Sequence, residues 1–192
     1  MLKVITAPTV EPLTLDEVKE QALPAGTDDD NLLTRLISVA REQAESLTKR
    51  SLAPKTLELV LDTWPGSEIR LPAGPVTAVS SVKYVDEDEA EQTLSTDVYE
   101  VDTDSLVARV KLRSAESWPD LNEQLNAVRV RYTAGFARAD VPQQVKQWML
   151  IRIASLYAQR ENHVVGYGST SVSQMGRSFA DSLLDEITVS EV

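Results

Sequence analysis

The chain has 192 residues, of which 42% are hydrophobic and 26% are charged, a composition typical of one or two globular domains. It has no cysteine and one histidine, His163, which excludes disulfide frameworks, thiolate zinc sites, cysteine nucleophiles and multi-histidine metal sites. The formal net charge of −11 disfavours tight wrapping of nucleic acid and adsorption to an anionic membrane. No stretch approaches the roughly 20 apolar residues of a membrane-spanning helix, and no signal peptide is evident, so we expect a soluble intracellular protein.

Residues 1–54 predict the N-terminal helices of a bundle. Thr14 and Glu17 have the spacing of a capping box, which marks the start of a short helix. The aspartates at 28–30 suit the positive end of a second helix. Over residues 30–50 apolar side chains then recur at helical spacing, namely Leu32, Leu33, Leu36, Ile37, Ala40, Ala44 and Leu47. We therefore expect a long amphipathic helix that packs against other helices.

Residues 55–135 predict an inserted antiparallel β-sheet. Leu57, Leu59 and Leu61 alternate along the chain, as in a half-buried strand, and a short strand follows at Ile69 and Leu71. Further strands are expected in four stretches rich in β-branched residues: 76–85, 98–101, 107–112 and 127–133. We therefore expect five or six strands in one antiparallel sheet. The insertion has 15 acidic and eight basic residues, so the turns that join the strands are expected to be acidic.

Residues 136–163 predict a long helix that completes the bundle. Pro142 suits its first turn, and apolar residues such as Trp148 and Ile151 lie on most faces of residues 142–162, which is typical of a buried helix. Residues 164–192 predict an extended C-terminal tail that ends in a short amphipathic segment. The expected fold class is therefore α+β: a helical bundle with an inserted antiparallel β-sheet and a C-terminal tail.

Catalytic motifs are missing from the sequence. The acidic run 86–89 lacks the glycine and the spacing of a calcium loop, so we interpret it as a solvated hairpin turn. No nucleophile elbow accompanies His163, and Gly166 and Gly168 do not form a nucleotide-binding fingerprint. We expect no catalytic residues, no cofactor, no bound metal and no enzymatic turnover. A hydrolase with two convergent carboxylates stays open, because sequence alone does not show which side chains converge.

A second alternative is a DNA-packaging or other accessory factor that contacts DNA through a basic strand face. The residues able to form such a face are Arg109, Lys111, Arg113, Arg129 and Arg131. Their acidic neighbours favour salt-bridged packing of the sheet instead.

The three tryptophans have different expected roles. Trp148 lies on the predicted buried helix and is expected in the core. Trp64 and Trp118 each precede a proline at the end of a strand, where an exposed ring is a possible interface anchor.

An ordered set of segments resembles the head-tail connector (adaptor) proteins of tailed double-stranded DNA bacteriophages and prophages. The resemblance covers residues 8–165 and rests on these stretches: Leu13-Thr14-Leu15-Asp16-Glu17-Val18-Lys19, Leu71-Pro72, Pro75-Val76, Val79 to Asp86, Tyr99-Glu100-Val101-Asp102, Trp118-Pro119, Val128 to Phe136, Val141-Pro142 and Tyr157-Ala158-Gln159-Arg160-Glu161. Residues 166–180 match no part of the family's pattern.

The resemblance implies a structural virion protein. Connectors of this family form a ring, usually a dodecamer, that docks under the portal protein and links the capsid to a stopper or other tail-completion protein. The implied location is the virion neck, after assembly in the host cytoplasm. Genomic DNA would pass through the ring's channel without sequence-specific binding, and an acidic ring suits that passage because it repels phosphate.

The tail is the expected portal-binding element. Its apolar residues Phe179, Leu183, Leu184 and Ile187 have the spacing of a helix that lays one face into a partner's groove. The alternative is that this segment folds back and covers apolar surface of its own bundle.

Overall fold

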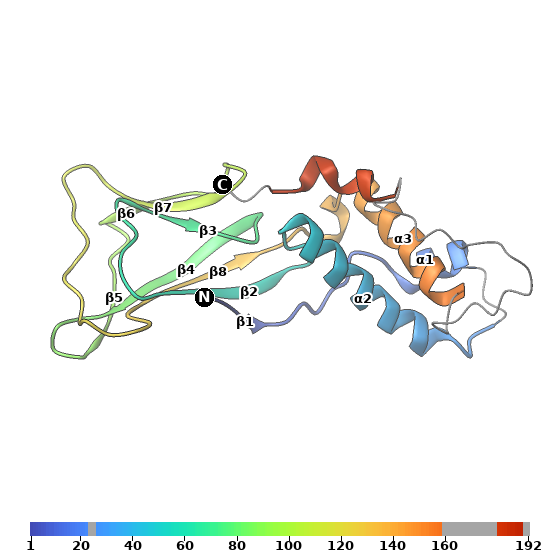
Figure 1. Cartoon of the computed structure of the whole chain (residues 1–192), viewed down its shortest axis with the longest axis horizontal. Coiled ribbons are helices and arrows are strands. Elements are labelled where there is room, and N and C mark those ends of the chain that lie inside the picture. The colour runs from blue at the N-terminus through green and yellow to red at the C-terminus, as the bar shows by residue number, and fades with distance from the viewer. Residues whose placement is uncertain (23–25, 159–179, 190–192) are drawn as a thin grey trace, which may run out of the picture. The chain divides into compact units, whose positions relative to one another are not determined.

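The computed structural model describes residues 1–22, 26–158 and 180–189, and the chain divides into two compact units (Figure 1). The first, here called the β unit, comprises Met1–Val10 and Lys49–Ala137. The second, here called the helical unit, comprises Glu11–Thr48 and Arg138–Val192. The β unit is thus an insertion between helices that also includes the first ten residues of the chain.

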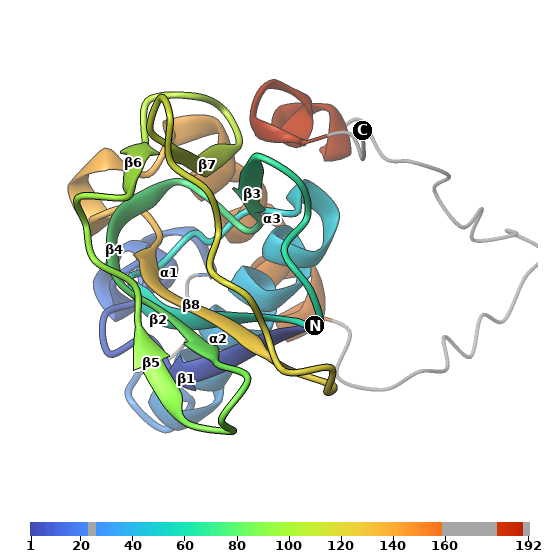
Figure 2. The same cartoon turned by 90° about the vertical axis from the view of Figure 1, so that its left-hand side faces the viewer.

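The β unit consists of two antiparallel sheets (Figure 2). Buried apolar side chains from both sheets form one core. The larger sheet has the order β1-β2-β8-β4-β5, with strands β1 (Leu2–Thr6), β2 (Lys55–Leu61), β8 (Val128–Ala134), β4 (Val76–Val85) and β5 (Glu91–Thr93). The smaller sheet has the order β3-β7-β6, with strands β3 (Glu68–Leu71), β7 (Ala108–Leu112) and β6 (Tyr99–Asp102).

Alternation along the central strands explains the core of the β unit. Leu57 and Leu59 of β2 lie opposite Tyr132 and Val130 of β8, and all four are buried. Opposite residues of an antiparallel pair share a face, so this register places four large side chains on the inner face of the sheet. Tyr132 is fully buried, its hydroxyl donates a 2.7 Å hydrogen bond to the carbonyl of Pro72, and burial raises its pKa.

The helical unit contains α1 (Leu15–Ala22), α2 (Asp30–Thr48), α3 (Gln143–Ala158) and the short 3-10 helices η1 (Arg138–Asp140) and η2 (Asp181–Ile187). The capping box is present: the Thr14 amide donates to Glu17 Oε2 (2.7 Å), and the Glu17 amide donates to Thr14 Oγ1 (3.2 Å). The core of the unit is formed by one face of each α-helix, with the buried residues Val18, Leu33, Ile37, Ala40, Ala44, Val145, Trp148, Met149 and Ile153.

A buried arginine fixes the entry to the helical unit. Arg41 of α2 is 6% exposed, and its guanidinium contacts Glu11 (2.8 Å) and Glu45 (3.1 Å). Because a buried charge needs partners, these carboxylates tie the first residue of the unit to the middle of α2.

The structure differs from the sequence-based expectation at three places. Residues 1–54 were expected in the bundle, but Leu2–Thr6 form β1, an edge strand whose residues are all exposed and whose partner β2 lies some fifty residues away. The strands form two sheets rather than one, since β3, β7 and β6 pair only among themselves. The short strand β5 had no apolar pattern to reveal it, because its three residues are all polar and exposed.

Candidate interaction surfaces

The described residues contain no group of three or more histidine, cysteine or acidic side chains placed to hold a metal ion. In the same part of the chain, no helix has the length and apolar character needed to span a bilayer. The candidate features described next are surfaces that other proteins could cover.

Helix α2 exposes an apolar flank beside its buried face. Leu32, Leu36, Val39, Gln43 and Leu47 recur every three or four residues, so they form one stripe along the helix. We call these five residues the α2 stripe. Val39 is 39% exposed and Leu47 is 52% exposed, while the other three are half-buried. None of the five carries a charge.

Helix α3 presents an uncharged outward face. Its members again recur every three or four residues, and they are Gln144, Gln147, Ile151, Ser155 and Ala158, which we call the α3 stripe. All five are exposed, Ile151 to 38%. The expectation that this helix is buried on most faces is thus wrong for Ile151, because the α-helices and η2 cover only the side of Val145, Trp148, Met149 and Ile153.

The C-terminal segment packs onto its own unit. Leu184 (2% exposed) and Ile187 (7% exposed) are buried where η2 contacts α3 and α2, and Leu183 is half-buried. The indole nitrogen of Trp148 donates a 3.0 Å hydrogen bond to Asp181 Oδ1. Residues 180–189 therefore adopt the fold-back arrangement that the sequence left open. Phe179 and His163 lie outside the described residues, and portal binding by the tail stays a prediction.

Trp64 and Trp118 form one aromatic cluster instead of two separate anchors. Their rings stack with centroids 4.5 Å apart and an interplanar angle of 9°. The indole nitrogen of Trp64 donates to the carbonyl of Pro119 (2.9 Å), and that of Trp118 donates to the carbonyl of Gly66. The two rings are half-buried, and their contact joins the loop after β2 to the loop after β7. A role of these tryptophans at an interface stays a prediction.

The acidic run after β4 forms a hairpin turn around Asp86. The Asp86 carboxylate accepts hydrogen bonds from the Gln92 side chain (2.8 Å) and from the amides of Ala90 (2.9 Å) and Asp88 (3.1 Å). These bonds, that of Gln92 first, lower the pKa of Asp86. The turn is thus organised by its own polar groups, with the remaining carboxylates in solvent.

The basic strand residues do not form one surface. Arg129 and Arg131 lie on the outer face of the larger sheet, whereas Arg109 and Lys111 lie on the outer face of the smaller sheet. The three arginines are ion-paired, to Glu91 (3.0 Å), Glu58 (2.7 Å) and Asp102 (3.1 Å) respectively. This separation and pairing do not favour a DNA-contacting face.

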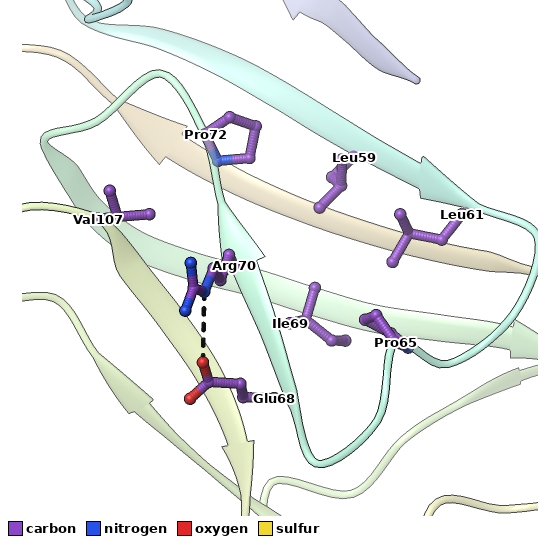
Figure 3. A pocket seen from close by; sticks show the side chains of 8 residues that line it. All are labelled: Leu59, Leu61, Pro65, Glu68, Ile69, Arg70, Pro72 and Val107. Carbon is purple, nitrogen blue, oxygen red and sulfur yellow. Dashed lines mark hydrogen bonds and ion pairs between the residues drawn. The ribbon is translucent and has the colours of Figure 1, made fainter. Parts of the chain in front are cut away.

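An apolar groove of about 550 Å³ opens between β2 and β3 (Figure 3). Its walls include Leu59 and Leu61 of β2 and Ile69 of β3, and the ion pair of Glu68 with Arg70 (3.4 Å) lies at the rim. The other lining residues are Pro65, Pro72 and Val107. The alternation of Leu57, Leu59 and Leu61 predicted a half-buried strand and did not indicate this opening.

Comparison with known proteins identifies the family. The model of the family described as phage gp6-like head-tail connector protein matches residues 12–108, half of the chain. No curated protein matches the sequence.

The fold is shared with chains of gene transfer agent (GTA) particles. A chain from the neck of the empty particle, computed with C6 symmetry, has a TM-score of 0.79 at 20% identity, and a chain from the native virion has 0.79 at 21%. A chain from the neck of the native particle, computed with C12 symmetry, has 0.78 at 20%. Each comparison covers 100% of this chain and 97% of the other. The chain shares its α+β fold with these chains, and by the match of its residues 12–108 it belongs to the phage gp6-like head-tail connector family, which makes it a structural connector protein.

Proposed function

We propose that this protein forms a ring, with twelve copies, in the neck of a phage-like particle, where it docks under the portal protein and binds a stopper or other tail-completion protein. The observation that carries the proposal is the connector-family match together with a fold shared over the full chain with neck proteins, one of them in a neck of C12 symmetry. The role is structural and needs no catalytic chemistry.

The charge of the chain supports a passive DNA channel. At −11 per copy, a ring of twelve would present a strongly negative surface, which repels the phosphate backbone and lets DNA slide through without sequence-specific binding. The ion-paired arginines of β7 and β8 leave the sheets without one basic face.

Mass photometry of the purified protein, alone and with a portal ring, tests the proposal. We expect a complex whose added mass corresponds to twelve copies. No binding to portal, or a two-fold dimer in place of a ring, would overturn the proposal.

The C-terminal segment remains the proposed portal-docking element, with Leu183 as its accessible apolar residue. Substitutions at two neighbouring residues distinguish docking of this segment to the portal from its packing onto the helical unit. Leu183→Ser is expected to weaken portal binding with little change in thermal stability, because Leu183 is only half-buried. Leu184→Ser is expected to lower stability, because Leu184 is 2% exposed. If Leu183→Ser binds portal as the wild type does, this segment is not the docking element.

A further inference from the structure

Adjacent copies of a connector ring must meet through two different surfaces. Head-to-tail contacts that close into a ring are heterologous, so the patch on one copy differs from the patch that it meets on the next. The helical unit supplies two such patches, the α2 stripe and the α3 stripe. This inference rests on the ring proposed above.

The two stripes are separate surfaces of one unit. Arg152 marks the side of α3 that meets α2, since its Nε donates a 2.8 Å hydrogen bond to Gln43 Oε1. Ile151 precedes Arg152 in the same helix, so its side chain is turned from that side by about 100°. The α3 stripe is therefore turned to one side of the contact between α2 and α3. Gln43 of the α2 stripe is covered within one copy through its bond to Arg152, whereas Val39 and Leu47 are more than a third exposed and are accessible to a second copy.

Charge selects a second copy as the occupant of these stripes. Two chains of −11 repel each other through most of their surfaces. Helix α3 is the exception among the three α-helices: it has Lys146 and Arg152 and no acidic residue. Contact through an uncharged stripe on a cationic helix thus brings no acidic side chain of α3 against the next acidic copy, which lowers the like-charge repulsion between copies.

We infer that the α3 stripe of one copy packs against the α2 stripe of the next copy, and that this contact closes the ring. The apolar anchors are Ile151 on one side and Val39 and Leu47 on the other, all more than a third exposed in the single chain. Three side chains make a small apolar contact, so we expect copies to remain monomeric in solution and to assemble when the portal holds them side by side.

Cysteine cross-linking tests this contact directly, because the natural chain has no cysteine to interfere. Under mild oxidation on a portal ring, the double variant Leu47→Cys/Ile151→Cys is expected to give a ladder of covalent oligomers. An equal mixture of the two single variants is expected to give dimers and no longer species, which excludes cross-linking within one copy. Each single variant alone is expected to stay monomeric.

In the matched control, the cysteine at position 47 is moved to an exposed residue of the β unit, and Leu47 is left unchanged. Val101 is as exposed as Ile151, at 38%, so Val101→Cys/Ile151→Cys reports accidental collisions. A ladder from this control equal to that of the test pair would overturn the inference. Dimers from Ile151→Cys alone would also overturn it, since they indicate a two-fold contact of α3 with itself.

A charge variant gives a second readout. Ile151→Glu is expected to lower ring occupancy on portal at least tenfold, and adding Leu47→Lys is expected to restore it, while Val101→Glu leaves it unchanged. Full rings from Ile151→Glu would refute the contact and leave the proposed function intact. Failure of the wild type to form rings on portal would instead refute the proposed function.

Discussion

Gly135, which follows β8, is the glycine whose replacement should damage the β unit most. Its φ of +120° is a backbone conformation that side-chain-bearing residues rarely adopt. A Cβ atom at this position would lie 2.2 Å from the carbonyl oxygen of Ala53 and 2.9 Å from the nitrogen of Pro54. Both are backbone atoms, so relief requires a shift of the main chain, and the Gly135 amide is itself bonded to the carbonyl of Pro75 (2.9 Å).

The expected loss for Gly135→Ala combines two terms. The backbone conformation costs about 1–2 kcal/mol, and the overlap adds about 1–3 kcal/mol. A substitution at Gly66 measures the backbone term alone, because the φ of Gly66 is +84° but a Cβ atom there meets nothing within 4 Å. Gly66→Ala should therefore lose only the first term.

Denaturant unfolding followed by tryptophan fluorescence measures both variants, because Trp64 and Trp118 report on the β unit. We expect Gly135→Ala to lose about 2–5 kcal/mol of unfolding free energy and Gly66→Ala about 1–2 kcal/mol. Equal losses for the two variants would refute the steric argument.

Three further outcomes are expected. Glu17→Gln should destabilise the protein by about 1 kcal/mol at neutral pH. Bonding to the Thr14 amide lowers the folded-state pKa of Glu17, so its stabilising contribution is present above pH 4.5 and is lost as the pH falls through the folded value, which pH-dependent denaturation would show. The Asp102 carboxyl should titrate with a pKa of about 2, because the Ser105 hydroxyl and amide bond to it, and Ser105→Ala should move the NMR titration toward 3.8. Trp118→Ala should speed amide exchange in residues 113–127, whereas Leu125→Ala, at a side chain 77% exposed in the same loop, should leave exchange unchanged.

Local signals in the sequence were sufficient to predict several elements. The capping box needs only Thr14 and Glu17, which are three residues apart and bond to each other. The strands with one buried face were predicted within about two residues, because their alternation reflects the core that buries them. The long helix predicted over residues 30–50 corresponds to α2. It was predictable because the spacing of its apolar residues reflects the face that it buries.

The features that the sequence did not predict depend on distant partners. Strand β1 is held by pairing with β2, and its exposed side chains follow no buried face that a pattern could reveal. The stacking of Trp64 on Trp118 joins loops more than fifty residues apart, so each ring appeared in the sequence as a separate exposed candidate. The burial of Leu184 and Ile187 was left open, because an amphipathic segment has the same pattern whether it covers its own bundle or a partner's groove.

The distribution of charge over the two units links fold to assembly. The β insertion holds the acidic turn after β4 and ion pairs on both outer faces, features that keep exposed sheet edges and surfaces from associating. Helix α3, by contrast, carries an uncharged stripe although it belongs to the same acidic chain. Ile151 is a large apolar side chain exposed among the polar members of this stripe, and the proposed contact between copies would cover it after assembly. In free solution the weak contact between stripes does not offset the repulsion between acidic copies. The same contact suffices when a symmetric partner holds the copies at close spacing.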